Sequence, residues 1–337
     1  VLDIVGENWS DNFISEVGLN YRMAPAHLLR FSSNYTYQTA KVKDYSIDPA
    51  RHKLAFLTSY NYNAPSGKLS LGASLRNELL DGNWLPMMPA LGLNWDVTKT
   101  VMLKASVNRN YRIPTFNDLY WNPGGNLNLK PEQGWSMDAA VEFNKTSRKS
   151  QFKVNVSPYT SFVNNWIIWL PGQSGIWSPE NVRKVWSRGF ESMVLYKLTS
   201  DQFKLQLKGV YAFSKSTNEK VESGSGNLLD KQLIYTPLHN ANGSFGAEWK
   251  GFYLGAIVHY TGKRYTSADN ANYLKAFTTM DVVFVKVFKI KNQKLKASFR
   301  VNNAFDHNYQ VVQWRPMPGR NYLFSVAYIF NHLNKNQ

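Results

Sequence analysis

The feature that most constrains this chain is an alternation of apolar and polar residues that returns in segment after segment. In one segment the alternate residues Val101, Leu103, Ala105 and Val107 are apolar, and most residues between them are polar. Successive side chains of a β-strand point to opposite faces, so each such segment has one apolar and one polar face. No segment with helical periodicity competes, and the pattern predicts an all-β protein.

About fifteen segments carry this alternation, and many of them have about 10 residues or more, where about 5–6 is usual in globular proteins and 9–11 in a membrane-spanning strand. They lie near residues 12–22, 27–38, 51–62, 68–78, 87–95, 100–110, 135–145, 151–163, 183–198, 202–214, 239–249, 252–261, 277–288, 294–302 and 320–330. These lengths favour the strands of a transmembrane antiparallel β-barrel.

The connections between these segments alternate between short and long. The short ones are residues 23–26, 63–67, 96–99, 146–150, 199–201, 250–251 and 289–293. The long ones fall near 39–50, 79–86, 111–134, 164–182, 215–238, 262–276 and 303–319. Tight periplasmic turns and long extracellular loops are typical of outer-membrane barrels. We therefore expect the irregular stretch 108–133 to be an extracellular loop.

Composition agrees with a barrel and argues against other classes. No run of about 18 apolar residues is present, so no transmembrane helix is expected. A mean hydropathy of −0.39 is compatible with a barrel whose apolar face takes only alternate residues. No signal peptide is recognisable, and the chain has no cysteine. The net charge is +16 without a block of five basic residues. An anionic lipid surface is the expected counter-charge, and nucleic acid is not an expected partner.

Aromatic residues support the barrel interpretation, because Tyr and Trp gather near strand ends as in the interfacial girdles of membrane barrels. They are Tyr35, Tyr37, Tyr60, Tyr62, Tyr111, Trp135, Tyr196, Tyr253 and Tyr260. The alternative is ordinary β-propensity, which also favours aromatic residues in strands. The final strand "NYLFSVAYIF" resembles the aromatic C-terminal strand of outer-membrane proteins, and it is followed by a polar tail, 331–337, expected in the periplasm.

Strand parity leads to an expectation about the limits of the barrel. If the last strand runs inward, the strand near 12–22 does too, and residues 1–11 are then the end of an extracellular loop. Single-chain barrels of this type have even strand numbers. We therefore expect residues 1–330 to be the C-terminal part of a larger barrel. Residues near 12–22 and 320–330 are each expected to be an open edge.

Two motifs resemble those of TonB-dependent outer-membrane receptors. One is "YRIPTFNDLYWNPGGNLNLKPEQGWSMDAAVEF", residues 111–143, and the other is "VNNAFDHNYQVVQWRPMPGRNYLFSVAYIF", residues 301–330. The stretch "TGKRYTSADN", residues 261–270, fits a loop between them, so the resemblance spans nearly the whole chain. The Pro-Met-Pro-Gly element is most similar to the cobalamin-transporter branch of Bacteroidetes. The residues expected to have structural roles in these motifs are Arg112, Pro114, Asp118, Pro131, Pro316, Pro318 and Gly319.

The resemblance implies a barrel of 22 strands with an N-terminal plug and a TonB box, neither of which is in this sequence. It implies energy-dependent import of a bulky nutrient, with cobalamin or a related corrinoid the preferred cargo. A ferric-siderophore receptor is the alternative within transport, and a porin or structural barrel that scaffolds a partner is the alternative outside it. Expected partners are TonB through the plug segment, the absent plug and strands, membrane lipids or lipopolysaccharide, and a surface lipoprotein.

Bulky aromatic residues in the loops are the candidate ligand contacts, because large rigid rings anchor ligands and partners. They are Trp84, Tyr120, Trp121, Trp166, Trp169, Trp177 and Trp314. The competing interpretation of each ring is packing between loops or a place at the lipid interface. Arg112 is expected to pair with a carboxylate, Asp118 being the local candidate, more readily than with substrate.

No enzyme activity, cofactor or metal is expected. The six histidines lack metal-ligand spacing, and none lies between Arg112 and Lys130, which disfavours haem uptake given the family resemblance. Asp138 and Glu142 are expected to neutralise Lys104 and its neighbours rather than to act as an acid–base pair. No Ser/His/Asp arrangement is recognisable.

Overall fold

The computed structural model describes residues 7–171, 176–220, 228–290 and 293–330, and long strands dominate this part of the chain. The long strands are β1 (Asn8–Ala24), β2 (His27–Val42), β3 (Ala50–Asn63), β4 (Leu69–Leu80), β6 (Met88–Asp96), β7 (Val101–Arg112), β8 (Glu132–Thr146), β9 (Ser150–Pro171), β10 (Trp177–Thr199), β11 (Phe203–Lys220), β12 (His239–Trp249), β13 (Phe252–Thr261), β16 (Phe277–Ile290), β17 (Gln293–Asn302) and β20 (Asn321–Ile329).

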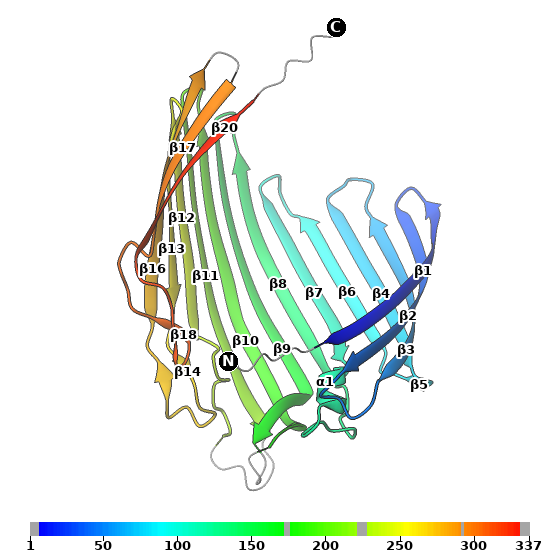
Figure 1. Cartoon of the computed structure of the whole chain (residues 1–337). Helices are drawn as coiled ribbons and strands as arrows, with labels where there is room; N and C mark the ends of the chain where they lie inside the picture. Colours follow the sequence, from blue (N-terminus) through cyan, green and yellow to red (C-terminus); the bar gives the residue numbers. More distant parts are fainter. Residues whose placement is uncertain (1–6, 172–175, 221–227, 291–292, 331–337) are drawn as a thin grey trace. The chain divides into compact units, whose positions relative to one another are not determined.

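These strands pair in chain order, which is the topology of an antiparallel meander (Figure 1). The main sheet runs β1-β2-β3-β4-β6-β7-β8-β9-β10-β11-β12-β13-β16-β17-β20. β1 and β20 stand at the two ends of this order, in agreement with the expectation that each is an edge strand.

Short elements lie in the long connections. β5 (Asn83–Trp84) pairs with β4, β14 (Arg264–Tyr265) pairs with β15 (Tyr273–Leu274), and β18 (Gln310–Val312) pairs with β19 (Arg315–Pro316). A five-residue helix, α1 (Phe116–Tyr120), lies between β7 and β8. Among the described residues, no helix has the length and hydropathy needed to cross a membrane.

The chain forms two units, each with its own set of contacts. Unit 1 comprises residues 1–140, 159–188 and 216–230, and unit 2 comprises 141–158, 189–215 and 231–337. β8, β9, β10 and β11 contribute residues to both units. The polar tail expected at 331–337 lies outside the described residues.

Register shows that the sequence alternation becomes two opposed faces of the sheet. In unit 1 one row across the strands consists of Tyr21, Leu29, Tyr60, Ala73, Leu91 and Val107. The adjacent row, which points to the opposite face, consists of Asn20, Arg30, Ser59, Ser74, Ala90 and Asn108. In unit 2 the apolar row is Leu207, Phe245, Ala256, Val282, Val301 and Tyr322. We call these two sides the apolar face and the polar face.

Several predictions about the connections were wrong in part, and in residues 215–238 β11 continues to Lys220. Residues 164–182 were expected to be a long loop, but β9 continues to Pro171 and β10 begins at Trp177. Residues 108–133 were expected to be irregular throughout, but β7 extends to Arg112 and α1 follows it. All fifteen expected strands are present, and most differences at their ends are extensions by a few residues.

Candidate functional site: the connection between β7 and β8

The connection between β7 and β8 is shaped first by a helix cap. Thr115 has extended backbone angles and accepts a hydrogen bond from the Asp118 N–H (3.1 Å), while the Thr115 N–H donates to Asp118 Oδ2 (2.9 Å). This reciprocal pair is a capping box, which satisfies two amide donors at the start of a helix. The cap fixes where α1 begins and points the Asp118 carboxylate inward, where the residue is 6% exposed.

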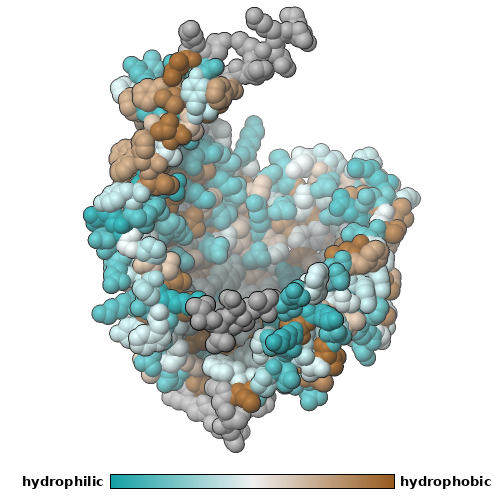
Figure 2. All heavy atoms as spheres, viewed as in Figure 1, coloured by the Kyte–Doolittle hydropathy of each residue, from teal (hydrophilic) through white to brown (hydrophobic). Residues whose placement is uncertain are grey.

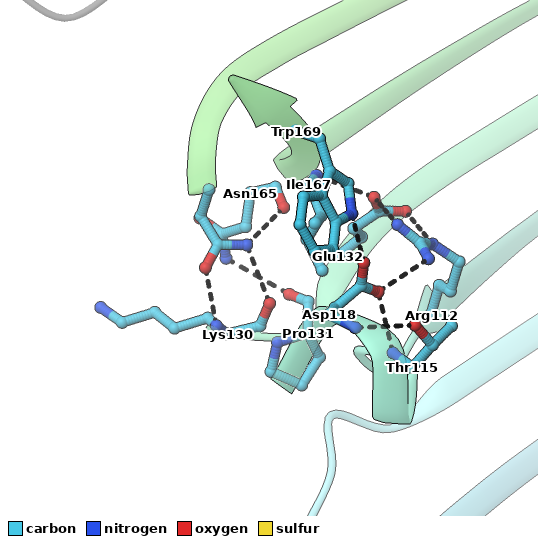
Figure 3. A network of polar contacts seen from close by, with 10 residues as sticks. Arg112, Thr115, Asp118, Lys130, Pro131, Glu132, Asn165, Ile167 and Trp169 are labelled. Carbon is cyan, nitrogen blue, oxygen red and sulfur yellow. Dashed lines mark hydrogen bonds and ion pairs between the residues drawn. The ribbon is translucent and has the colours of Figure 1, made fainter. Parts of the chain in front are cut away.

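Arg112 joins both ends of the connection (Figure 3). Its guanidinium donates from Nε to Glu132 Oε2 at 2.8 Å and from Nη2 to Glu132 Oε1 at 2.5 Å, and Nη1 lies 3.7 Å from Asp118 Oδ2. A planar guanidinium suits this two-bond contact with a carboxylate. The expected partner Asp118 is present, but the tighter contact is with Glu132, the first residue of β8.

β9 supplies the remaining donors that two nearly buried carboxylates require. Trp169 Nε1 donates to Asp118 Oδ1 at 3.0 Å, and the Ile167 backbone N–H donates to Glu132 Oε1 at 2.8 Å. A buried charge is costly without such partners. The extension of β9 beyond residue 163 is therefore the element that completes this network (Figure 3).

A second set of bonds ties the later part of the connection to β9 and β10. Asn181 Nδ2 donates to the carbonyls of Lys130 (2.9 Å) and Asn165 (2.8 Å), and its Oδ1 accepts from the Lys130 N–H (2.7 Å). Asn126 Nδ2 donates to the Pro179 carbonyl at 3.0 Å. One asparagine side chain thus joins three backbone segments.

The start of β3 and the connection that precedes it are bonded to the same structure. Arg51 Nη2 donates to the Pro114 carbonyl at 3.0 Å, and its guanidinium carbon lies 4.6 Å from the centre of the Phe116 ring. The Tyr45 hydroxyl donates to Asn117 Oδ1. Burial, and next the negative charge of Asp118, raises the pKa of the Tyr45 phenol. The phenol therefore remains a hydrogen-bond donor at neutral pH.

Glycines allow the segments to approach each other. A Cβ on Gly124, whose φ is +126°, would lie 2.2 Å from the Trp177 carbonyl oxygen. A Cβ on Gly125 would lie 2.6 Å from the Leu119 carbonyl oxygen. The Gly-Gly pair is therefore needed for close backbone contact as well as for backbone freedom.

Four of the expected ligand aromatics in unit 1 lie at or beside this network. Tyr120 ends α1, Trp121 follows it in an isolated bridge with Tyr45, Trp169 bonds Asp118, and the Trp177 carbonyl meets Gly124. Trp121 is 37% exposed and Trp177 is 56% exposed, so both present ring surface at this end of the sheet.

The other three aromatics have different surroundings. Trp166 is half-buried in β9. Trp84, in β5, is 62% exposed and lies 6.4 Å from the Phe56 ring, centre to centre. Trp314 is 84% exposed and belongs to unit 2, in the turn between β18 and β19.

The proline and glycine residues of the two motifs have backbone roles. The Pro114 carbonyl accepts from Arg51, and the Pro131 carbonyl accepts from Asn165 Nδ2 at 3.5 Å. In unit 2, Pro316 pairs with Gln310 in the β18–β19 hairpin, and the Pro318 carbonyl lies 3.4 Å from Asn303 Nδ2.

Gly319 lies in the same unit, where a Cβ would come within 3.2 Å of Asp306 Oδ1.

Glu132, Asn181 and Arg51 are among the members of the network that the sequence interpretation missed. Glu132 had a signal, because it follows Pro131 at a strand start in a segment already singled out. Asn181 and Arg51 had none, since each lies far along the chain from its partners. Of the expected lumen carboxylates, Asp138 accepts from Ser106 Oγ at 2.5 Å and Glu142 pairs with Lys153 at 2.7 Å.

Chemically, the arrangement positions loops and has no reacting pair. Its charged groups bond one another, backbone N–H and carbonyl groups and the Trp169 indole, and exposed rings lie at the same end of the sheet. Within the described part of the chain, no group of three or more His, Cys, Asp or Glu residues is arranged to hold a metal. The structure is suited to present a rigid recognition surface.

Comparisons with known proteins agree with this architecture. The family model described as "TonB dependent receptor-like, beta-barrel" matches residues 2–304. A protein of Photobacterium profundum, named vitamin B12 transporter BtuB, is 28% identical over 253 residues, covering 71% of this chain and 37% of that protein. A protein of Vibrio vulnificus (strain YJ016) with the same name is 28% identical over 248 residues, with the same coverage.

Solved structures show the same fold at lower identity. The FrpB iron transporter from Neisseria meningitidis (F5-1 variant) superposes with a TM-score of 0.74 at 16% identity, covering 96% of this chain and 56% of that one. The ferric enterobactin receptor PfeA superposes with a TM-score of 0.72 at 18% identity, covering 96% and 54%. The chain thus spans about 37% of the length of these curated relatives and little more than half of the solved chains.

Proposed function

Because the chain belongs to the TonB-dependent receptor-like β-barrel family, we propose that it serves outer-membrane import of a bulky nutrient, most favourably cobalamin or a related corrinoid. The observation that carries the proposal is the family match over residues 2–304. Members of this family are transporters rather than enzymes. The strands form the wall, and the short turns face the periplasm.

The choice of corrinoid comes from the curated relatives. Both proteins at 28% identity are named vitamin B12 transporters. The solved neighbours are named for iron and ferric enterobactin, but at 16–18% identity they support the fold alone. A ferric siderophore is the second candidate cargo. The net charge of +16 favours it if the chelate is anionic.

The proposed binding surface is the rigid end of unit 1 described above. Trp121 and Trp177 expose ring surface there, and Leu127 is 68% exposed. The Trp121 backbone is bonded within the connection, where its N–H donates to the Asn117 carbonyl and its carbonyl accepts from the Gly125 N–H, so little ordering of this residue would oppose binding. In this proposal TonB acts through a plug segment that releases the bound cargo inward.

Import is tested by uptake of labelled cyanocobalamin into cells that carry or lack the complete gene, in a host that needs external cobalamin for growth. We expect uptake and growth only with the gene, and loss of both when TonB is removed. Uptake that persists without TonB would support a porin, and uptake of a ferric siderophore but not of cobalamin would support the second candidate.

Two variants test the binding surface within the same assay. Trp121→Ala and Trp177→Ala are expected to weaken cobalamin binding by about tenfold each, because truncating an aromatic anchor typically costs about 1–2 kcal/mol or more. Trp95→Ala is the matched control, since Trp95 is also exposed but lies on the apolar face of β6. Equal losses in all three variants would contradict the assigned surface.

A further inference from the structure

A groove of about 520 Å³ lies on the apolar face of unit 2, beside the short turn between β12 and β13. It is lined mainly by rings and aliphatic groups from β12, β13, β16, β17 and β20, including Trp249, Phe252, Leu254, Phe284, Phe299 and Phe324. Figure 2 shows apolar residues gathered over β17 and β20 in this region. The groove is suited to a flexible hydrocarbon chain.

Two lysines stand where the groove meets the turn. Lys286 lines the groove, its Nζ lies 3.4 Å from the centre of the Phe252 ring, and it donates to the Lys250 carbonyl at 3.3 Å. Lys250 is in the turn itself, with Nζ 5.2 Å from the centre of the Trp249 ring. Aromatic faces hold both ammonium groups beside the apolar groove.

These two charges have no carboxylate partner among the described residues. The nearby acid, Glu248, points to the polar face, where Lys204 Nζ lies 3.2 Å from its Oε2. Lys289 and Lys294, also close to this end of the sheet, stand directly opposite each other on β16 and β17. The turn end of unit 2 therefore carries an excess of positive charge that favours an anionic neighbour.

The turn conformation is a second, independent sign that Lys250 has a role. Lys250 has a φ of +45° and Gly251 a φ of +78°. Two-residue hairpin turns with two positive φ angles prefer Asn, Asp or Gly at the first position. A lysine there is less favourable for the backbone, and departures of this kind point to a function of the side chain.

We propose that this groove is a binding site for an anionic phospholipid of the leaflet that surrounds the turn end. An acyl chain lies along the rings, and the phosphate is bound by Lys250 and Lys286. Charge complementarity decides the headgroup, because two unpaired ammonium groups at the apolar boundary favour a negative lipid over a zwitterionic one. The proposal rests on the outer-membrane location proposed above, and it is independent of which nutrient is imported.

The test measures how tightly lipid is retained by the purified full-length receptor. Native mass spectrometry in detergent would compare dioleoyl-phosphatidylglycerol with dioleoyl-phosphatidylcholine, and glycerol 1-phosphate would test the headgroup alone. A basic residue near a lipid surface contributes enough for about fivefold in affinity. We expect one phosphatidylglycerol to bind about 25-fold more tightly than phosphatidylcholine, and glycerol phosphate to bind far more weakly.

Variants then locate the site. Lys250→Asn suits the turn, and with Lys286→Gln it should lower phosphatidylglycerol affinity to that of phosphatidylcholine, while each single change costs about fivefold. The matched control is Lys208→Gln with Lys296→Gln, which removes two charges from the polar face of unit 2. The control pair should bind phosphatidylglycerol within about twofold of the unaltered receptor.

Several outcomes would overturn the proposal: equal retention of both lipids, equal losses in the control pair, or a second receptor copy covering the groove. Lys286→Arg keeps the charge and should retain the lipid, so it decides the question if the double variant does not fold. Loss of lipid with normal nutrient uptake would leave the import proposal intact. Failed nutrient uptake with normal lipid retention would leave the lipid-site proposal intact.

Discussion

At the scale of single residues, Glu132 is bonded by both the end of β7 and the extension of β9. It accepts two bonds from Arg112 and one from the Ile167 N–H, and it is 7% exposed. Glu132→Gln keeps the shape but removes the charge, and a hydrogen bond to a charged group contributes about 1.5–3 kcal/mol. Because the Arg112 side chain is 47% exposed, we expect the lower end, about 1.5 kcal/mol.

The measurement is hydrogen exchange in the β7–β8 connection, which should become faster in the Glu132→Gln variant. Glu248→Gln serves as the control, because its pair with Lys204 is exposed on both sides and exposed pairs contribute at most about 1 kcal/mol. Unchanged exchange at Asn126 and Ile167 in Glu132→Gln would show that the carboxylate does not hold the connection.

The sequence could predict part of this site. Thr115 followed by Asp118 three residues later is a helix-start signal, and Arg112 beside Asp118 suggested an ion pair. What could not be predicted was the competition between carboxylates: Glu132 is 20 residues away and is brought to Arg112 by the pairing of β7 with β8. Contacts across strands depend on register, which no single segment contains.

At the scale of the elements, β8 and β9 approach each other closely at Gly134. A Cβ there would lie 2.4 Å from the Phe162 carbonyl oxygen, a distance that requires backbone movement. We expect Gly134→Ala to destabilise the sheet by about 1–3 kcal/mol, the usual cost of overpacking. Gly92→Ala, in β6, is the control because a Cβ there meets no atom within 4 Å.

Heat-modifiable migration on gels would report the difference between these two glycine variants. The Gly134→Ala receptor should unfold at a lower temperature than the Gly92→Ala receptor, which should match the unaltered protein. Equal thermal unfolding midpoints for the two variants would mean that the close approach of β8 and β9 is not maintained in the membrane.

The two faces of β6 lead to a further prediction about substitutions on each face. Leu91, on the apolar face, is 58% exposed, and its neighbour Ala90 points to the polar face. If the apolar face meets lipid, Leu91→Arg should destabilise the barrel by about 2–4 kcal/mol, while Ala90→Arg should have little effect. Reversible unfolding in lipid vesicles measures both, and a larger effect at Ala90 would reverse the assignment of the faces.

The strands themselves were predictable because the alternation in the sequence and the register of the sheet place the same residues on the apolar face. Apolar positions of neighbouring segments pair with one another across the strands, as Leu91 does with Val107 and Leu103 with Trp95. The extension of β9 was missed because Pro and Gly near residue 171 indicated a loop. The run of aromatic and β-branched residues from Trp166 to Trp169 was a signal for strand that could have been used.

In the molecule as a whole, charge distinguishes the two candidate cargoes. The chain has a net charge of +16, and its long-range field acts on a ligand before contact is made. Exposed charges are screened over about 10 Å at 0.1 M salt and about 3 Å at 1 M. Association with an anionic chelate should therefore fall steeply with salt, whereas association with a cargo of little net charge should not.

We expect cyanocobalamin binding to the full receptor to change by less than about twofold between about 0.05 and 0.5 M sodium chloride, because aromatic contact at Trp121 and Trp177 is insensitive to screening. An anionic ferric chelate, measured in parallel by titration, should lose about tenfold if it binds through the field of the molecule. A receptor that binds the chelate more tightly at low salt and ignores cyanocobalamin at every salt concentration would be a siderophore receptor. In that case the corrinoid proposal would be wrong, even though the fold and the loop network would stand.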